Sequence, residues 1–316
     1  MADAPDPRTR YRSIIADSRR WDDFAFRPGD IVISTPPKCG TTWTQMLCAL
    51  LIFDGPAFPA SLDAMSPWLD MCNRPLAEVQ SALASQTHRR FIKTHTPLDG
   101  LRLRADVTYL VVGRDPRDVA ISFEHHAANL DFARFLELRA AAVGNEDLAE
   151  LPAPRFLASD PVERFRTFIA DETRAAPPLT LASVLHHLDT GWRRRSDPNV
   201  ALFHYADLQA DLAGELLRLA RVLGIRCSPQ RARDLAPEAS LARMRERAAD
   251  VAPVAAQGHW KDVSAFFRSG ATGEWRDRLA ASDLAAYEAR VAALVGPDLA
   301  AWAHGGRLKS GVDPER

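Results

Sequence analysis

Near its start the chain changes from one spacing of apolar residues to another, and this change predicts a strand followed by a helix. Residues 31–33 form a short apolar run with β-branched side chains, which is typical of a buried strand. Over 43–51 the apolar residues recur at helical spacing, which indicates a helix with one buried face. Between them, 34–42 contains two prolines and a glycine and predicts a tight loop. Thr41 and Thr42 are expected to cap the helix.

The same order of elements recurs along the chain. Further strands are expected from Phe91 toward Pro97, at 108–112 and at 200–205, and further helices at 132–143, 161–169, 181–195 and 212–223. Strands that alternate with helices predict an α/β fold, with a mostly parallel sheet covered by helices on both faces. A length of 316 residues with 47% hydrophobic residues suits a single domain over 1–316, whose first 20 residues are expected to fray or to form an exposed helix.

Charge and cysteine content exclude several classes of protein. The 40 basic and 41 acidic residues nearly cancel, which argues against a general nucleic-acid or anionic-membrane surface. The four cysteines lack metal-binding spacing and are expected to be buried thiols, as in a reducing compartment. The start of the chain lacks an apolar signal, and no apolar run approaches the ~20 residues of a membrane span. We therefore expect a cytoplasmic protein without a span. The paired histidines at 125–126 and 186–187 lack a metal-site pattern as well.

The loop at 34–42 has the features of an anion-binding site. The first N–H groups of a helix have no internal partners, and the helix dipole places partial positive charge there. Gly40 allows close approach of the backbone, and Lys38 brings a full charge. A nucleotide P-loop would place the lysine after its last glycine, whereas Lys38 precedes Gly40. The alternative is an ordinary turn with a solvated lysine.

Charged side chains also follow two other predicted strands. Lys93 and His95 lie at the end of the second strand, and Arg114 follows the third. Asp115 is a candidate helix cap, and Asp118 three residues later could complete a capping box. Because ligands bind at the carboxyl ends of strands in open α/β sheets, these side chains are expected to meet the loop at 34–42. A purely structural histidine and an arginine paired with a carboxylate are the alternatives.

Four segments, in this order, resemble those of the soluble sulfotransferases that use 3′-phosphoadenosine 5′-phosphosulfate (PAPS). They are P-x-K-x-G-T-T-W at 36–43, K-T-H-x-P at 93–97, R-x-P-R-D-x-x-x-S at 114–122 and R-S-G-x-x-G-E-W-R at 268–276. The resemblance implies a P-loop-like three-layer sandwich with a central, mostly parallel sheet. It also implies transfer of a sulfuryl group from PAPS to a hydroxyl or amine of a small acceptor, without a metal.

The resemblance further implies a role for individual residues. His95 would be the general base, and Lys38 and Lys93 would stabilise charge on the leaving phosphate and the sulfuryl oxygens. The nucleotide would be bound by Lys38, Cys39, Gly40, Thr41, Thr42, Trp43, Arg114, Ser122, Tyr205, Ser240, Arg268, Ser269 and Gly270. Within this set Trp43 and Tyr205 would contact adenine, whereas Arg114, Ser122 and Arg268 would bind the 3′-phosphate.

The chain departs from the family pattern at several positions. Ser269 replaces a lysine of the phosphate clamp, and Leu241 replaces an aromatic residue near adenine. The segment at 276–285 lacks the threonine, valine and glutamate of the family's dimer contact, so dimerisation through it is doubtful. The stretch at 131–179 is longer than in the family, and is either a lid over the acceptor pocket or an inert insertion.

Two other functions and a range of acceptors stay open at this point. A magnesium-dependent nucleotide kinase uses a similar loop, and a non-catalytic nucleotide-binding module would not need His95. Phe58, Trp68 and Phe123 are candidates for an apolar pocket, which suggests a phenol, alcohol, amine or lipid-like acceptor.

Overall fold

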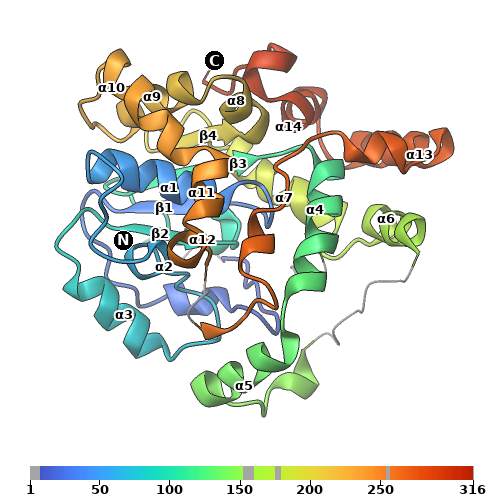
Figure 1. Ribbon diagram of the computed structural model, residues 1–316. Coiled ribbons are helices and arrows are strands. Elements are labelled where there is room, and N and C mark those ends of the chain that lie inside the picture. Colours follow the sequence, from blue (N-terminus) through green and yellow to red (C-terminus); the bar gives the residue numbers. More distant parts are fainter. Residues whose placement is uncertain (1–7, 152–159, 175–178, 254–256, 316) are drawn as a thin grey trace, which may run out of the picture.

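The protein is built on a sheet of four parallel strands, seen in a computed structural model that describes residues 8–151, 160–174, 179–253 and 257–315. The strands are β1 (Ile31–Ser34), β2 (Phe91–Thr94), β3 (Thr108–Gly113) and β4 (Val200–His204), arranged in the order β2-β1-β3-β4 (Figure 1). Ser34 at the end of β1 pairs with Thr94 of β2 and with Val111 of β3. The carboxyl ends of the central strands therefore lie at one edge of the sheet, as predicted.

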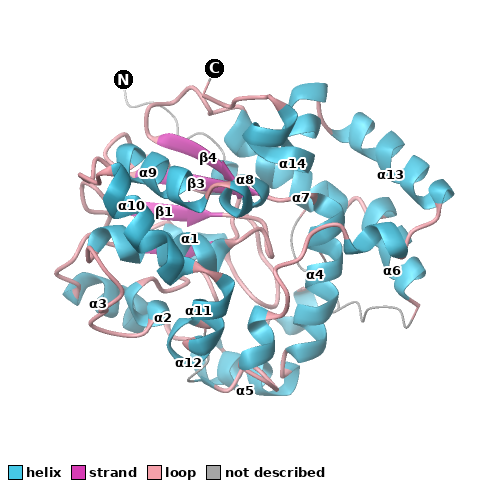
Figure 2. Ribbon diagram, turned by 45° about the horizontal axis from the view of Figure 1, so that its top comes forward, coloured by secondary structure: helices cyan, strands magenta, loops and turns pink. Residues whose placement is uncertain are grey.

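Alternate strand residues face two separate hydrophobic cores. Val32, Ile92 and Val111 belong to one cluster with apolar residues of the C-terminal helices, while Ile33 and Leu110 belong to a second cluster with the first helix. A strand that is buried on both faces needs apolar side chains at every position, which explains the unbroken apolar runs in the sequence. The three-layer α/β sandwich is confirmed (Figure 2).

Helices cover both faces of the sheet. The helices of the first half of the chain are α1 (Thr41–Ile52), α2 (Leu62–Met65), α3 (Leu76–Ser85), α4 (Pro116–Asn129), α5 (Phe132–Val143) and α6 (Pro161–Ala170). Those of the second half are α7 (Leu181–Trp192), α8 (Tyr205–Ala210), α9 (Leu212–Val222), α10 (Pro229–Leu235), α11 (Leu241–Glu246), α12 (Ala248–Val251), α13 (Ala281–Leu294) and α14 (Pro297–Ser310). Among the described residues, no helix is long and apolar enough to cross a membrane.

Three local expectations are wrong. The N-cap of α1 is Gly40, in the left-handed region and without a side-chain cap bond, rather than Thr41 or Thr42. Tyr205 begins α8 instead of ending β4. Asp118 does not close a capping box: its Oδ1 accepts a hydrogen bond from the N–H of Gly273 at 2.7 Å. The contact of Asp118 joins segments that lie far apart in the chain, which the local pattern could not reveal.

The N-terminal segment also differs from expectation within its described part. Residues 8–20 do not form an exposed helix: Ile14 and Arg20 are buried, and a short 3₁₀ helix runs from Ser18 to Trp21. The Arg20 guanidinium donates to the carbonyl of Leu69 at 3.0 Å. Residues 1–7 lie outside the described part of the chain.

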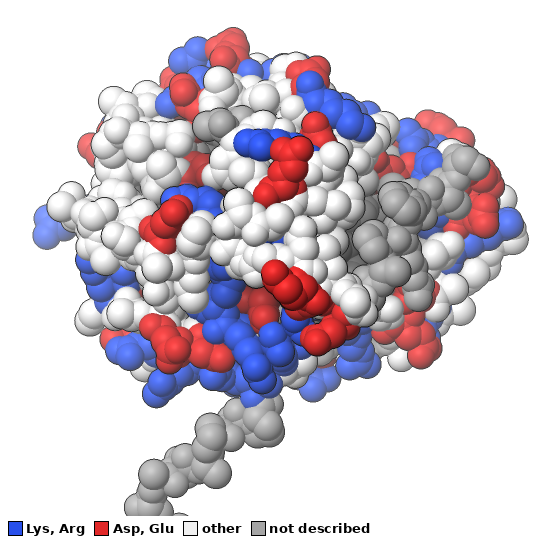
Figure 3. All heavy atoms as spheres, turned by 90° about the horizontal axis from the view of Figure 1, so that it is seen from below, with Lys and Arg blue, Asp and Glu red and all other residues white. Residues whose placement is uncertain are grey.

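The surface carries both signs of charge. On the face seen in Figure 3, acidic and basic side chains lie beside one another around a wide uncharged area. This mixture agrees with the formal net charge of −1.

Candidate active site

The loop between β1 and α1 is shaped to leave helical N–H groups available. Lys38 and Gly40 both have positive φ angles, 69° and 101°, so the backbone turns sharply before the helix. A Cβ at Gly40 would lie 3.2 Å from the ring of Tyr205. The first turn of α1 has neither an acidic residue nor a side-chain cap. Its N–H groups and dipole therefore favour an anion, as the sequence predicted.

Lys38 is the cation of this loop. Its Nζ lies 3.3 Å from Nδ1 of His126 and 4.8 Å from the ring centre of Phe266. Burial, and next the positive charge of Arg114, lower the pKa of Lys38 to about 7. A lysine held in this way gains a full charge when an anion arrives.

His95 is oriented as a proton acceptor. Its Nδ1 donates to the carbonyl of Thr35 at 2.7 Å, so in the neutral ring Nε2 carries the lone pair. Burial lowers the pKa of His95 to about 3, which keeps the ring neutral. Trp68 packs against this ring edge to face, with the centres 4.6 Å apart, and Nζ of Lys93 lies 5.2 Å from the Trp68 ring centre.

Asp70 fixes the strand end that carries His95. The hydroxyl groups of Thr94 and Thr96, on either side of His95, both donate to Oδ2 of Asp70 at 2.6 Å. Asp70 is fully buried, and burial raises the pKa of its carboxyl group. The pair of hydrogen bonds holds the backbone on both sides of the candidate base.

Arg114 joins two parts of the site. It donates to the carbonyl of Lys38 at 3.1 Å and to that of Ala271 at 3.0 Å, so the expected alternative of a carboxylate partner is wrong. Its guanidinium carbon lies 4.3 Å from the ring centre of Tyr205, and that ring packs edge to face on Trp43 at 5.1 Å. The buried Nε of Arg114 has no hydrogen-bond partner among the described residues.

The segment at 268–276 lies beside Arg114 and Tyr205. Arg268 pairs with Glu274, and the hydroxyl of Ser269 donates to the same carboxylate at 3.2 Å. The carbonyl of Gly270 accepts from Tyr205 at 3.3 Å. This segment is therefore attached to Tyr205 as well as to Arg114.

One cavity of about 1550 Å³ brings most of the predicted residues together. It is lined by Lys38, Gly40, Thr41, Thr42, Trp43, Lys93, His95, Arg114, Ser122, Tyr205, Arg268, Ser269 and Gly270. Two predicted residues do not line it. Cys39 is buried in the core, and Ser240 caps α11 by accepting from the N–H of Arg243 at 3.4 Å.

The remaining wall of the cavity is largely apolar and aromatic. Trp68 and Phe123 line it as expected, whereas Phe58 packs on Phe53 away from it. The stretch at 131–179 contributes to this wall through residues such as Phe135 and Phe168, while 152–159 and 175–178 lie outside the described residues.

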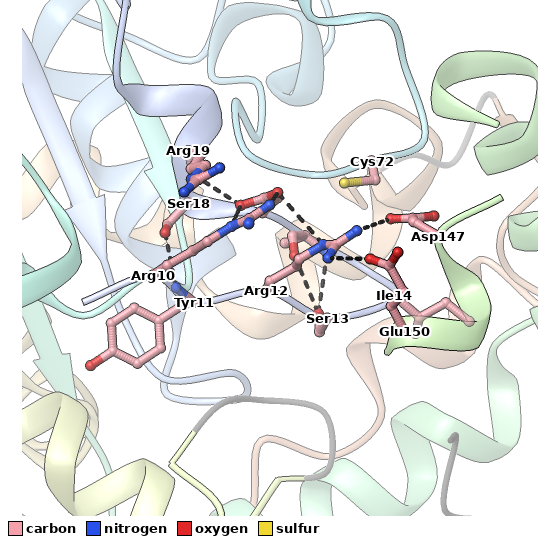
Figure 4. A network of polar contacts seen from close by, with 12 residues as sticks. Arg10, Tyr11, Arg12, Ser13, Ile14, Ser18, Arg19, Cys72, Asp147 and Glu150 are labelled. Atoms are coloured by element: carbon pink, nitrogen blue, oxygen red, sulfur yellow. Dashed lines mark hydrogen bonds and ion pairs between the residues drawn. The ribbon is translucent and has the colours of Figure 1, made fainter. Parts of the chain in front are cut away.

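Tyr11 and residues 13–16 form another part of this wall, which local sequence patterns did not reveal. Figure 4 shows the polar contacts that hold them. Arg12 pairs with Asp147 at 2.7 Å and Glu150 at 3.3 Å, and the buried Arg139 pairs with Asp147 at 2.8 Å and donates to the carbonyl of Ile14 at 3.1 Å. The network ties the N-terminal segment to the turn that follows α5.

His126 is another lining residue that sequence reasoning missed, since it was weighed only as a metal ligand. It lies four residues after Ser122 on α4, which places both on one face of the helix. That spacing was the available signal. Among the described residues, no cluster of three or more His, Cys, Asp or Glu side chains could hold a metal ion.

Comparison with known proteins shows the family and the fold of this chain. Residues 28–295 match the sulfotransferase domain family. The chain is 50% identical to a glycolipid sulfotransferase of Mycobacterium bovis over 97% of both chains, and 49% identical to one of Mycobacterium tuberculosis over 97% of both. Two solved structures share the fold. One is retinol dehydratase in complex with androsterone and inactive cofactor PAP, with a TM-score of 0.69 and 23% identity over 92% of this chain and 90% of that one. The other is a mouse sulfotransferase in complex with PAP, with a TM-score of 0.65 and 18% identity over 89% of this chain and 88% of that one.

Proposed function

Because this chain belongs to the sulfotransferase domain family, we propose that it transfers a sulfuryl group from PAPS to a hydroxyl group of a glycolipid-like acceptor. The observation that carries the proposal is that the anion-binding loop and His95 open into the same cavity. The cavity continues into an apolar, aromatic wall, which suits the lipid portion of such an acceptor. The mycobacterial relatives, named as glycolipid sulfotransferases, support this choice of acceptor.

The residues present fit the nucleotide. The uncapped start of α1 and Lys38 suit the 5′-phosphate, and the orphaned Nε of Arg114 suits an additional anion such as the 3′-phosphate. Trp43 and Tyr205 offer aromatic faces for adenine. Ser122 and Arg268 line the same side, although Arg268 would have to share or leave Glu274. When bound, PAPS supplies the sulfuryl group and a phosphate leaving group.

The chain's own residues account for the proton and the charge. As the acceptor oxygen forms its bond to sulfur, its proton passes to the lone pair on Nε2 of His95. With PAPS bound, Lys38 would neutralise the negative charge that grows on the phosphate oxygen as that oxygen leaves sulfur with the electron pair of their bond. Nζ of Lys93 lies 5.2 Å from the ring centre of Trp68, which packs against His95, and it would stabilise the sulfuryl oxygens.

Calorimetric titration tests the nucleotide class. The protein would be titrated with adenosine 3′,5′-bisphosphate and with ATP, each with and without Mg²⁺. We expect tight binding of the bisphosphate that is independent of Mg²⁺ and weaker in Arg114→Ala. A preference for Mg-ATP would contradict the proposal and favour a nucleotide kinase.

A variant of His95 separates an enzyme from a nucleotide-binding module. In His95→Ala we expect sulfuryl transfer to fall by about 10²–10⁴-fold, the usual contribution of a general base, while bisphosphate affinity stays within about threefold. Retained transfer would exclude His95 as the base.

A further inference from the structure

A histidine stands in the aromatic wall of the cavity, where an apolar ring would pack at lower cost. The ring centre of His126 lies 4.9 Å from that of Trp260, 6.0 Å from that of Phe123 and 6.2 Å from that of Phe266. Placing an imidazole among such rings costs free energy unless its nitrogens are hydrogen bonded. The contacts of its two ring nitrogens therefore decide what His126 can bind.

The Nδ1 side of His126 faces Lys38, whose Nζ is 3.3 Å away. An ammonium group can only donate, so with Lys38 charged Nδ1 accepts and the ring proton is on Nε2. Burial, followed by the charges of Lys38, His95 and Lys93, holds the pKa of His126 well below its usual 6.5, which keeps the ring neutral. Lys38 has three N–H groups and can keep this contact while another reaches a phosphate oxygen.

The Nε2 side of His126 is available to a ligand. Nε2 of the adjacent His125 is sealed from solvent without a partner, but Nε2 of His126 is not sealed, and the residue lines the cavity. No described residue forms a hydrogen bond with it. A neutral N–H donor therefore faces the cavity from the aromatic wall.

His95 presents the opposite hydrogen-bonding group. Its Nδ1 is the donor to Thr35, so its Nε2 is an acceptor. The charge of Lys38 acts on the pKa of both histidines, which places both near the same lysine. One cavity thus holds one imidazole that can take a proton and another that can donate a hydrogen bond.

We propose that Nε2–H of His126 binds an acceptor oxygen next to the hydroxyl that reacts, so that the site selects acceptors with neighbouring oxygens, such as a sugar ring, over an isolated alcohol. The inference rests on the proposed function, since it concerns the acceptor of that reaction. An isolated alcohol leaves the N–H of His126 without a hydrogen-bond partner. A site built to donate a hydrogen bond discriminates against a substrate that lacks the oxygen needed to accept it.

The test compares two acceptors that share an alkyl chain. Sulfuryl transfer from PAPS would be measured to octyl β-glucoside, below its micelle concentration, and to 1-octanol. His126→Phe keeps a ring in the wall but removes the donor, whereas His126→Gln restores an N–H donor. His125→Phe makes the same change at the adjacent position. The second measurement is calorimetric binding of octyl β-glucoside to protein saturated with adenosine 3′,5′-bisphosphate.

In His126→Phe we expect the ratio of kcat/KM for the glucoside to that for octanol to fall about tenfold, with glucoside binding weakened to a similar degree. His126→Gln should recover part of the ratio, and His125→Phe should leave it unchanged. The bisphosphate affinity of His126→Phe should stay within about threefold of the unaltered protein.

Several results would overturn the role of His126. They are an unchanged ratio in His126→Phe, an equal change in His125→Phe, and transfer by the unaltered protein to neither acceptor. Equal loss for both acceptors together with weaker bisphosphate binding would mean that His126 acts only through Lys38. Failure of the unaltered protein to bind the bisphosphate would instead remove the proposed function itself.

Discussion

Binding of the nucleotide should take up a proton, because Lys38 is largely uncharged at mildly alkaline pH in the empty site. Burial and the nearby Arg114 lower the pKa of Lys38 to about 7. At pH 8 only about one tenth of the molecules therefore carry the proton on this side chain. A phosphate oxygen beside Nζ favours the charged form and returns the pKa toward the ordinary range. Binding should then take up about 0.9 proton at pH 8 and about 0.5 at pH 7.

The same linkage sets the pH dependence of affinity. The pKa of Lys38 is lowered in the empty site, so the free energy needed to protonate Lys38 rises as the pH increases above 7. This cost reduces the free energy of bisphosphate binding. The apparent Kd for the bisphosphate should increase by about 50-fold between pH 7 and pH 9. At pH 8 the ligand's phosphates are already fully ionised, so a proton taken up there is bound by the protein.

Calorimetry in buffers of different ionisation enthalpy measures this proton directly. The slope of observed enthalpy against ionisation enthalpy gives the number of protons, which we expect near 0.9 at pH 8 for the unaltered protein. Lys38→Met should reduce the slope to near zero, whereas Lys309→Met, at an exposed lysine of α14, should leave it unchanged. A slope that is near zero in the unaltered protein, or unaffected by Lys38→Met, would refute the reasoning.

Two further predictions concern the backbone of the loop and the buried charges. Gly40→Ala places a Cβ at a positive φ angle and 3.2 Å from an aromatic ring carbon, so this change should weaken bisphosphate binding measured by calorimetry. The control change Gly311→Ala, at a φ angle of 73° with open space around it, should leave that binding unchanged. Asp30→Ala leaves the buried guanidinium of Arg90 without the carboxylate that it contacts at 2.8 Å, and should lower the free energy of unfolding in urea by about 3–5 kcal/mol. The matched change Asp106→Ala, in an exposed pair, should leave the urea midpoint unchanged, and equal effects of the two changes would contradict this account.

The loop at 34–42 is the part of the site for which the local sequence pattern was most informative. In the segment 34–42 the order of proline, lysine, glycine and threonine predicts both the turn and its affinity for an anion, since these properties depend on neighbouring residues. The parallel arrangement of the strands then brings Lys93, His95 and Arg114 to the same edge. For this part of the site, sequence reasoning and structure agree.

The sequence by itself therefore determined the α/β fold, its parallel sheet and the residues at the strand ends, because helical and strand periodicity and turn chemistry act over a few residues. The tertiary structure alone decided the contacts between distant segments. It placed His126 against Lys38, 88 residues apart, and Asp118 against Gly273, 155 residues apart. Such contacts depend on how helices pack over the sheet, which local spacing does not encode. The place of His126 in the wall of the cavity could be recognised only once that packing was known.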